Sequence, residues 1–127
     1  MNSLSRFLNL LFEELDNNRI KYAVCGNYVD LPDFTSHDID IVTNDIGAFE
    51  KTLSNISKKN GFKLVSKNKT ANGSNNIFYK EKEDEPLVVR IDIMHETCYK
   101  SIFPILTSDI ILSNIKRFKN FYIVSEE

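Results

Sequence analysis

The sequence predicts an α+β fold, or α/β by a looser naming, in which helices flank a mixed β-sheet. Two observations support this prediction. Apolar residues recur with a helical period in two segments of the first half, and a short strand-like run follows each segment. In the second half, strand-like runs follow one another. The 127 residues suit a single domain, so residues 1–127 are expected to share one core.

The elements of the first half follow from apolar spacing and from turn residues. Pro32 prevents a long regular helix in the loop between the first two strands. Thr43 or Asn44 is expected to cap the second helix, and Gly61 ends it. In chain order, the predicted elements are a helix over 3–17, a strand over 20–25, a strand over 38–42 and a helix over 45–60.

The second half of the chain is expected to be mainly antiparallel. Polar connections suited to hairpins join three predicted strands, over 62–65, 76–80 and 87–94. The tail is predicted to form helical turns over 99–112, interrupted by Pro104, and a last short strand over 121–124.

Composition argues against several classes of partner. A net charge of −2 gives no general attraction to nucleic acids or acidic membranes. Lysines crowd residues 58–69, but an acidic run at 80–85 balances them and no aromatic-rich binding motif accompanies them, so nucleic acid is not an expected partner. No segment approaches the roughly 20 apolar residues of a membrane span, and no signal peptide is recognised. Cys25 and Cys98 lack ligand spacing and indicate reduced thiols in a cytoplasmic protein.

Two aspartates share one face of the predicted strand over 38–42. Residues two apart in a strand point the same way, so Asp38 and Asp40 stand together while Ile39 and Ile41 face the core. Two carboxylates about 5 Å apart repel each other by about 3 kcal/mol at an effective dielectric of about 20. A divalent cation with oxygen ligands, Mg²⁺ or Mn²⁺, would offset this cost. The alternative is the solvent face of an edge strand.

A third acid lies in a similar apolar run, LVVRIDIMH, at residues 87–95. Arg90 and Asp92 share a face of this strand. If the strand neighbours the one that carries Asp38 and Asp40, three carboxylates and one guanidinium converge. Such a group suits two-metal phosphoryl or nucleotidyl transfer, and arginine binds phosphate through paired hydrogen bonds.

Together these residues resemble the pattern of the DNA polymerase β-like nucleotidyltransferase superfamily. Over residues 3–94 the spacing is similar to that of minimal and kanamycin-type nucleotidyltransferases. The stretch GNYVDLPDFTSHDIDIV also resembles nucleotidyltransferase-like proteins encoded among bacterial surface-polysaccharide genes. The matching positions are Gly26 and Asn27 after the first strand, a spacer over 28–37, the Asp38-Ile39-Asp40 motif and Asp92.

The resemblance implies a site and an activity. Asp38 and Asp40 would bind two Mg²⁺ or Mn²⁺ ions, and Asp92 would be a third ligand that also accepts the proton of the attacking hydroxyl. Backbone amides of Gly26 and Asn27 would cradle phosphates, because glycine permits close approach of the backbone to an anion. The implied enzyme transfers a nucleoside monophosphate from a triphosphate such as ATP to a hydroxyl of a small molecule, a sugar or a protein.

The pattern also departs from the family in ways that leave other hypotheses open. Asn27 stands where Ser or Gly is usual, and residues 28–37 contain no Lys or Arg. A catalytically degenerate module that acts by binding protein, antitoxin-like or regulatory, is the second hypothesis, and a piece of a larger protein is the third. Tyr28 either stacks on a base or packs under the loop, and His37 either contacts phosphate or is solvated. The nucleotide, the acceptor and the oligomeric state, homo-oligomer included, stay open.

Overall fold

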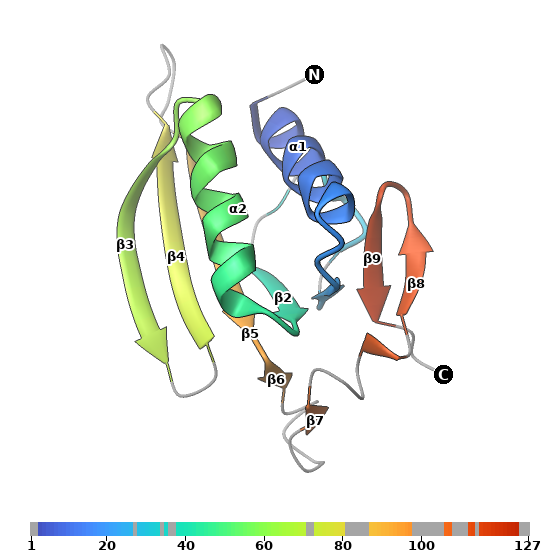
Figure 1. The fold of residues 1–127 in the computed structure, drawn as a ribbon. Helices are drawn as coiled ribbons and strands as arrows, with labels where there is room; N and C mark the ends of the chain where they lie inside the picture. Colours follow the sequence, from blue (N-terminus) through green and yellow to red (C-terminus); the bar gives the residue numbers. More distant parts are fainter. Residues whose placement is uncertain are drawn as a thin grey trace.

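A seven-stranded mixed sheet forms the centre of the protein, and two helices cover one of its faces (Figure 1). A computed structural model describes residues 3–26, 28–33, 35, 38–70, 73–80, 87–97, 106–107, 112–113 and 115–124. The predicted α+β class with a mixed sheet is confirmed. The helices are α1 (Ser3–Asn17) and α2 (Ile46–Lys59).

The strands of the main sheet lie in the order β3-β4-β5-β2-β1-β9-β8. Two neighbouring pairs are parallel, β2 with β5 and β1 with β9, and the others are antiparallel. A separate antiparallel pair joins β6 (Glu96–Thr97) to β7 (Leu106–Thr107). The main-sheet strands are β1 (Tyr22–Cys25), β2 (Ile39–Thr43), β3 (Lys63–Thr70), β4 (Gly73–Lys80), β5 (Leu87–Met94), β8 (Ile115–Phe118) and β9 (Phe121–Val124).

The core lies between the sheet and the helices. The apolar stripe predicted for residues 3–17 is buried along α1 and packs on inward-facing side chains of the central strands. Aromatic rings join the layers: Phe7 meets Phe62 edge-on at 4.6 Å, and Phe12 stacks on Phe121 at 4.9 Å. The opposite face of the central strands carries a smaller cluster around Ala23 and Val42.

The predicted cap of α2 is wrong by one or two residues. Asp45 is the N-cap, and its side chain accepts a hydrogen bond from the amide of Ala48 at 3.0 Å. The Thr43 hydroxyl instead donates to the carbonyl of Lys21 at 2.7 Å, which ties the end of β2 to the start of β1.

The first hairpin of the second half is longer than predicted. Strands over 62–65 and 76–80 were expected, whereas β3 and β4 continue to Thr70 and from Gly73. Polar residues fill the added length because β3 is an edge strand whose side chains are mostly exposed. The strand predicted over 87–94 is confirmed as β5, and its antiparallel pairing with β4 is also confirmed.

The tail differs more from its prediction. Helical turns over 99–112 are wrong at 106–107, which form β7, while residues 98–105 and 108–111 lie outside the described residues. The last strand, 121–124, is confirmed as β9, and it forms an unpredicted hairpin with β8. This hairpin reaches the centre of the fold because β9 pairs in parallel with β1, Val24 opposite Ile123.

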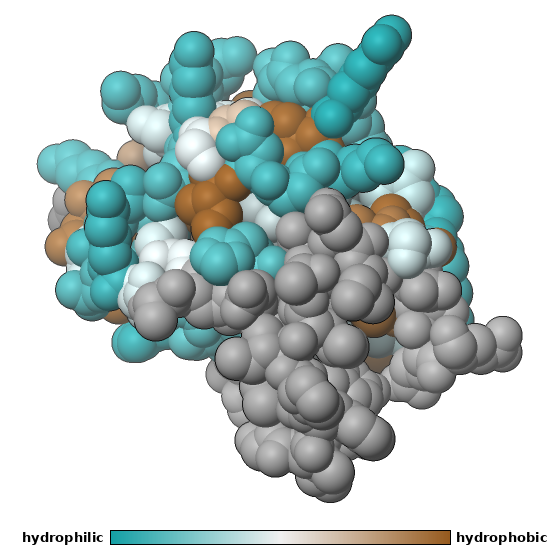
Figure 2. All heavy atoms as spheres, turned by 60° about the horizontal axis from the view of Figure 1, so that its bottom comes forward, coloured by the Kyte–Doolittle hydropathy of each residue, from teal (hydrophilic) through white to brown (hydrophobic). Residues whose placement is uncertain are grey.

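The surface is mainly hydrophilic over the described part of the face seen in Figure 2, where apolar groups form small separate patches. Among the described residues, no helix combines the length and the apolar character needed to cross a membrane.

Candidate acidic site

Asp40 and Asp92 lie side by side on neighbouring parallel strands. The register of β2 and β5 pairs Asp40 with Asp92 and Ile39 with Ile91. Because the isoleucines are buried in the helix-covered core, the two carboxylates point to the opposite face of the sheet. The central condition of the two-metal hypothesis, that these strands are neighbours, is therefore met for two of the three acids.

The electrostatics of the pair are unfavourable in the metal-free chain. Burial, a hydrogen bond with Asp92, and repulsion from the charges of Asp92 and Asp38 raise the pKa of Asp40 from 3.8 to about 6. Within the described residues, no Lys, Arg or His forms an ion pair with any of these three carboxylates. The site thus holds negative charge that the described part of the chain leaves without a counter-ion.

Asp38 and Arg90 flank the pair. Asp38 was predicted to lie inside the strand, but β2 begins at Ile39 and Asp38 is exposed just before it. Its charge nevertheless contributes to the raised pKa of Asp40. The described residues include no group of three or more Asp, Glu, His or Cys side chains arranged around one ion position. Arg90 is exposed two residues before Asp92 on the same face of β5. The assignment of Asp38 to ion binding and of Arg90 to phosphate binding stays a prediction.

Gly26 follows β1 and lies against the acidic pair. Its backbone has φ +74°, a left-handed conformation that favours glycine, and a Cβ built on it would lie 3.7 Å from Oδ2 of Asp40. The predicted neighbour in phosphate binding, Asn27, and also His37 lie outside the described residues. The chain therefore adopts a left-handed conformation beside the Asp40 carboxylate, and the role of Gly26 in phosphate binding stays a prediction.

Two further side chains belong to this site and were missed from sequence. Asn75 of β4 is paired with Asp92, and its Nδ2 donates a hydrogen bond to Oδ1 of Asp92. Cys25 of β1 is opposite Asp40; burial and then the charge of Asp40 raise the pKa of its thiol to about 11. The prediction left Asn75 in the connection before the strand over 76–80. In the structure it alternates with buried Ser74 and Asn76 along β4, so it faces the side of the sheet that carries Asp92.

Carboxylate oxygens, which Asp40 and Asp92 both carry, are the type of donor that hard divalent cations prefer. Asp40 and Asp92 offer carboxylate oxygens on two rigid central strands, and Asn75 orients one of them. Bringing a cation between them would relieve the repulsion that raises the pKa of Asp40. Mg²⁺ and Mn²⁺ suit such oxygen ligands better than Zn²⁺ does, since the only described thiol at the site, Cys25, is kept protonated at neutral pH.

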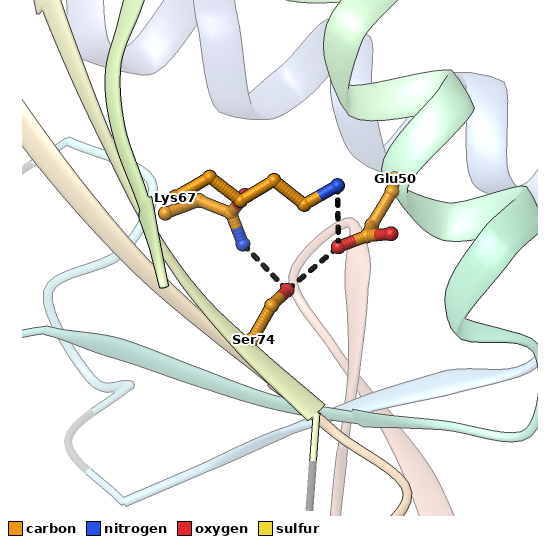
Figure 3. Close-up of polar contacts among 4 residues, drawn as sticks. Glu50, Lys67 and Ser74 are labelled. Carbon is orange, nitrogen blue, oxygen red and sulfur yellow. Dashed lines mark hydrogen bonds and ion pairs between the residues drawn. The ribbon is translucent and has the colours of Figure 1, made fainter. Parts of the chain in front are cut away.

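Another half-buried acid, Glu50 of α2, lies on the helix-covered face of the sheet, and a lysine offsets its charge (Figure 3). Its Oε2 accepts a hydrogen bond from the Ser74 hydroxyl at 2.7 Å and pairs with Nζ of Lys67 at 3.2 Å. Ser74 accepts in turn from Nδ2 of Asn76 at 2.9 Å. Glu50 and Ser74 also line an open pocket of about 260 Å³, together with Ile46, Lys69, Thr70, Gly73 and His95.

Comparisons with protein-family models, with curated proteins and with solved structures found no match to this chain. The chemistry of the site is therefore judged from its own residues.

Proposed function

We propose that this chain is a Mg²⁺- or Mn²⁺-dependent nucleotidyltransferase with a fold of the DNA polymerase β-like superfamily. It would move a nucleoside monophosphate from a triphosphate to a hydroxyl acceptor and release pyrophosphate. The observation that carries the proposal is the pairing of Asp40 with Asp92 across two parallel strands without a counter-ion among the described residues. Resemblance of the Asp38-Ile39-Asp40 motif to that superfamily supports it.

The three aspartates would act together. Asp40 and Asp92 would hold the cation, with Asp38 completing the ligand set from the start of β2. The bound ion would supply positive charge to the phosphate oxygens. Asp92 would accept the proton of the acceptor hydroxyl. The hydroxyl oxygen would then bond to the α-phosphorus while the bond from that phosphorus to pyrophosphate breaks. The hydrogen bond from Asn75 keeps Asp92 oriented for this role.

Two groups beside the aspartates suit phosphate. The backbone at Gly26 approaches the site without a side chain in the way, which allows amide contacts to a phosphate. Arg90 lies on the same face as Asp92 and reaches solvent, so it would contact the leaving pyrophosphate. This arginine supplies a positive charge that residues 28–37 lack.

Metal binding and label transfer test the proposal together. Calorimetry with Mn²⁺ should detect binding to the wild-type chain that disappears in the double variant Asp40→Asn with Asp92→Asn. Incubation with α-labelled nucleoside triphosphates, Mg²⁺ and a panel of hydroxyl-bearing acceptors should transfer label. Glu50→Gln is the matched control, because it removes a carboxylate on the other face and should keep both properties. Equal Mn²⁺ binding by the wild type and the double variant would refute the proposal.

The second hypothesis, a degenerate module that acts by binding protein, is favoured by Asn27 and by the missing Lys and Arg over 28–37. It predicts that nucleotide binds without turnover in any acceptor panel. It further predicts that the triple replacement of Asp38, Asp40 and Asp92 by Asn leaves the protein's biological effect unchanged.

A further inference from the structure

The loop that follows Gly26 starts and ends at the acidic site. Gly26 lies against Asp40, and the chain returns at Asp38, the residue before β2. Because residues 28–37 contain no Lys or Arg, phosphate contacts from this loop would come from backbone amides, hydroxyl groups or His37, and all of these depend on where the loop lies. Whatever holds the loop in place therefore controls the nucleotide site, if the function proposed above is correct.

Lys119 contacts the backbone of this loop directly. Its Nζ donates hydrogen bonds to the carbonyl oxygens of Val29 and Leu31, both at 2.9 Å. An ammonium group has three donors, so it can satisfy two carbonyls at once. The contact joins the turn between β8 and β9 to a loop about ninety residues earlier in the chain.

The position of Lys119 in its turn indicates that its side chain matters. Its backbone has φ +54°, a left-handed conformation in which glycine or asparagine is less strained than lysine. The neighbouring ring of Phe118 meets the ring of Tyr28 edge-on at 4.9 Å, so the same hairpin holds the loop by an apolar contact as well. Tyr28 is thus packed against protein, which favours packing over base stacking.

Other contacts fix the far part of the loop. Leu31 is 1% exposed and belongs to the core, and the Ser5 hydroxyl of α1 donates to Oδ1 of Asp33 at 2.8 Å. Amides inside the loop also bond locally, Leu31 to the carbonyl of Tyr28 and Asp33 to that of Asp30, both at 3.0 Å. These bonds give a direct readout of loop order by hydrogen exchange.

We propose that Lys119 is a positioning residue for nucleotide binding: by holding the carbonyls of Val29 and Leu31, it fixes the loop whose two ends, Gly26 and Asp38, lie beside Asp40. This inference rests on the proposed function. Lys119 itself touches no reacting atom. Its loss should therefore weaken nucleotide binding and leave Mn²⁺ binding by Asp40 and Asp92 unchanged.

The test compares Lys119→Met with Lys116→Met in the full chain. Lys116 is an exposed lysine of the same hairpin, so its replacement removes the same charge without the loop contact. The probe is the α,β-methylene analogue of ATP with Mn²⁺. Lys119→Met should bind the analogue about fivefold more weakly or worse, and the amides of Leu31 and Asp33 should exchange about tenfold faster. Lys119→Arg should restore most of both properties, and Mn²⁺ affinity should be equal in all variants.

The outcomes separate this inference from the proposed function. Unchanged exchange at Leu31 and Asp33 in Lys119→Met would overturn it, as would equal analogue binding by both methionine variants. A fall in analogue affinity of the same size in Lys116→Met would assign the effect to charge alone and also overturn it. Absence of Mn²⁺ and analogue binding in the wild type would instead remove the proposed function, and the inference with it.

Discussion

Glu50 and Asp40 are both half-buried carboxylates, the first on helix α2 and the second on strand β2, yet they have opposite surroundings. Glu50 lies under α2 with a serine hydroxyl and a lysine ammonium on the same oxygen (Figure 3). Asp40 faces another carboxylate, Asp92, on the side of the sheet away from the helices. Lys67 offsets the charge of Glu50, whereas no Lys, Arg or His among the described residues forms an ion pair with Asp40.

The difference separates a structural acid from a binding acid. A buried carboxylate that is paired and hydrogen-bonded contributes to the fold, and removing it leaves its partners unsatisfied. A carboxylate whose pKa is raised by burial and by like charges costs stability when ionised, and for this reason we propose that Asp40 binds a ligand of opposite charge. Three predictions test this contrast between Glu50 and Asp40.

The largest effect is expected on catalysis. Under the proposed function, Asp92→Asn would remove both a cation ligand and the group that accepts the hydroxyl proton, so label transfer should fall by about 10³-fold or more. Glu50→Gln should stay within about threefold of the wild type, because Glu50 contacts Ser74 and Lys67 and not the acidic pair. Rates are measured as transferred label per minute at saturating Mg²⁺.

A comparable loss of activity in Glu50→Gln would show that the contrast between the two acids is wrong. Melting temperatures of both variants serve as the control, since a rate lost through unfolding would appear there too.

The second effect is on stability, and here the replacement of Glu50 is expected to be harmful. Glu50→Ala leaves the buried Ser74 hydroxyl without its acceptor and Lys67 without its partner, so the free energy of unfolding should fall by about 1–2 kcal/mol. Glu50→Gln keeps an acceptor oxygen for Ser74 and loses only a half-exposed ion pair, which is worth less than about 1 kcal/mol. Urea unfolding followed by circular dichroism measures both.

The contrast requires Glu50→Ala to be the more damaging of the two replacements. Equal stability of Glu50→Ala and wild type would mean that water in the adjoining pocket replaces the carboxylate, and Glu50 would lose its structural role.

Sequence patterns predicted the directions of the acidic side chains but not the pairing of the strands that carry them. Strand alternation placed Asp40 and Asp92 opposite their isoleucine neighbours, because one buried face specifies the direction of every side chain. The parallel pairing that brings the two together depends on contacts fifty residues apart, which no local pattern encodes. The sequence predicted that the acids converge only if the two strands are neighbours, and β2 and β5 are neighbours in the sheet.

The errors have physical causes as well. Asn75 was assigned to a connection because polar residues with a nearby glycine are typical of turns, whereas β5 and β3 both pair with this segment and hold it extended. Thr43 has the chemistry of an N-cap, but the carbonyl of Lys21 takes its hydroxyl, and Asp45 caps α2 instead. In both cases a tertiary contact overrides a local preference.

The smallest effect is a pH dependence of stability at the acidic pair. The pKa of Asp40 is raised from 3.8 to about 6 in the folded chain, so the folded state binds more protons than the unfolded state between these values. Stability of the metal-free wild type should therefore fall as the pH rises from about 4 to about 6. Asp40→Asn lacks this loss, and it should exceed the wild type at pH 7.5 by on the order of 1 kcal/mol, a figure reduced for partial exposure.

The comparison is made by urea unfolding in EDTA across this pH range and again with Mg²⁺. The two proteins should be equally stable below pH 4 and diverge above it, because the wild type then carries a charge without a counter-ion. Mg²⁺ should stabilise the wild type alone and close the gap, since a ligand that binds only the folded state adds to its stability. A gap that stays constant with pH, or that Mg²⁺ leaves unchanged, would mean that Asp40 has no unsatisfied charge, and the contrast with Glu50 would fail.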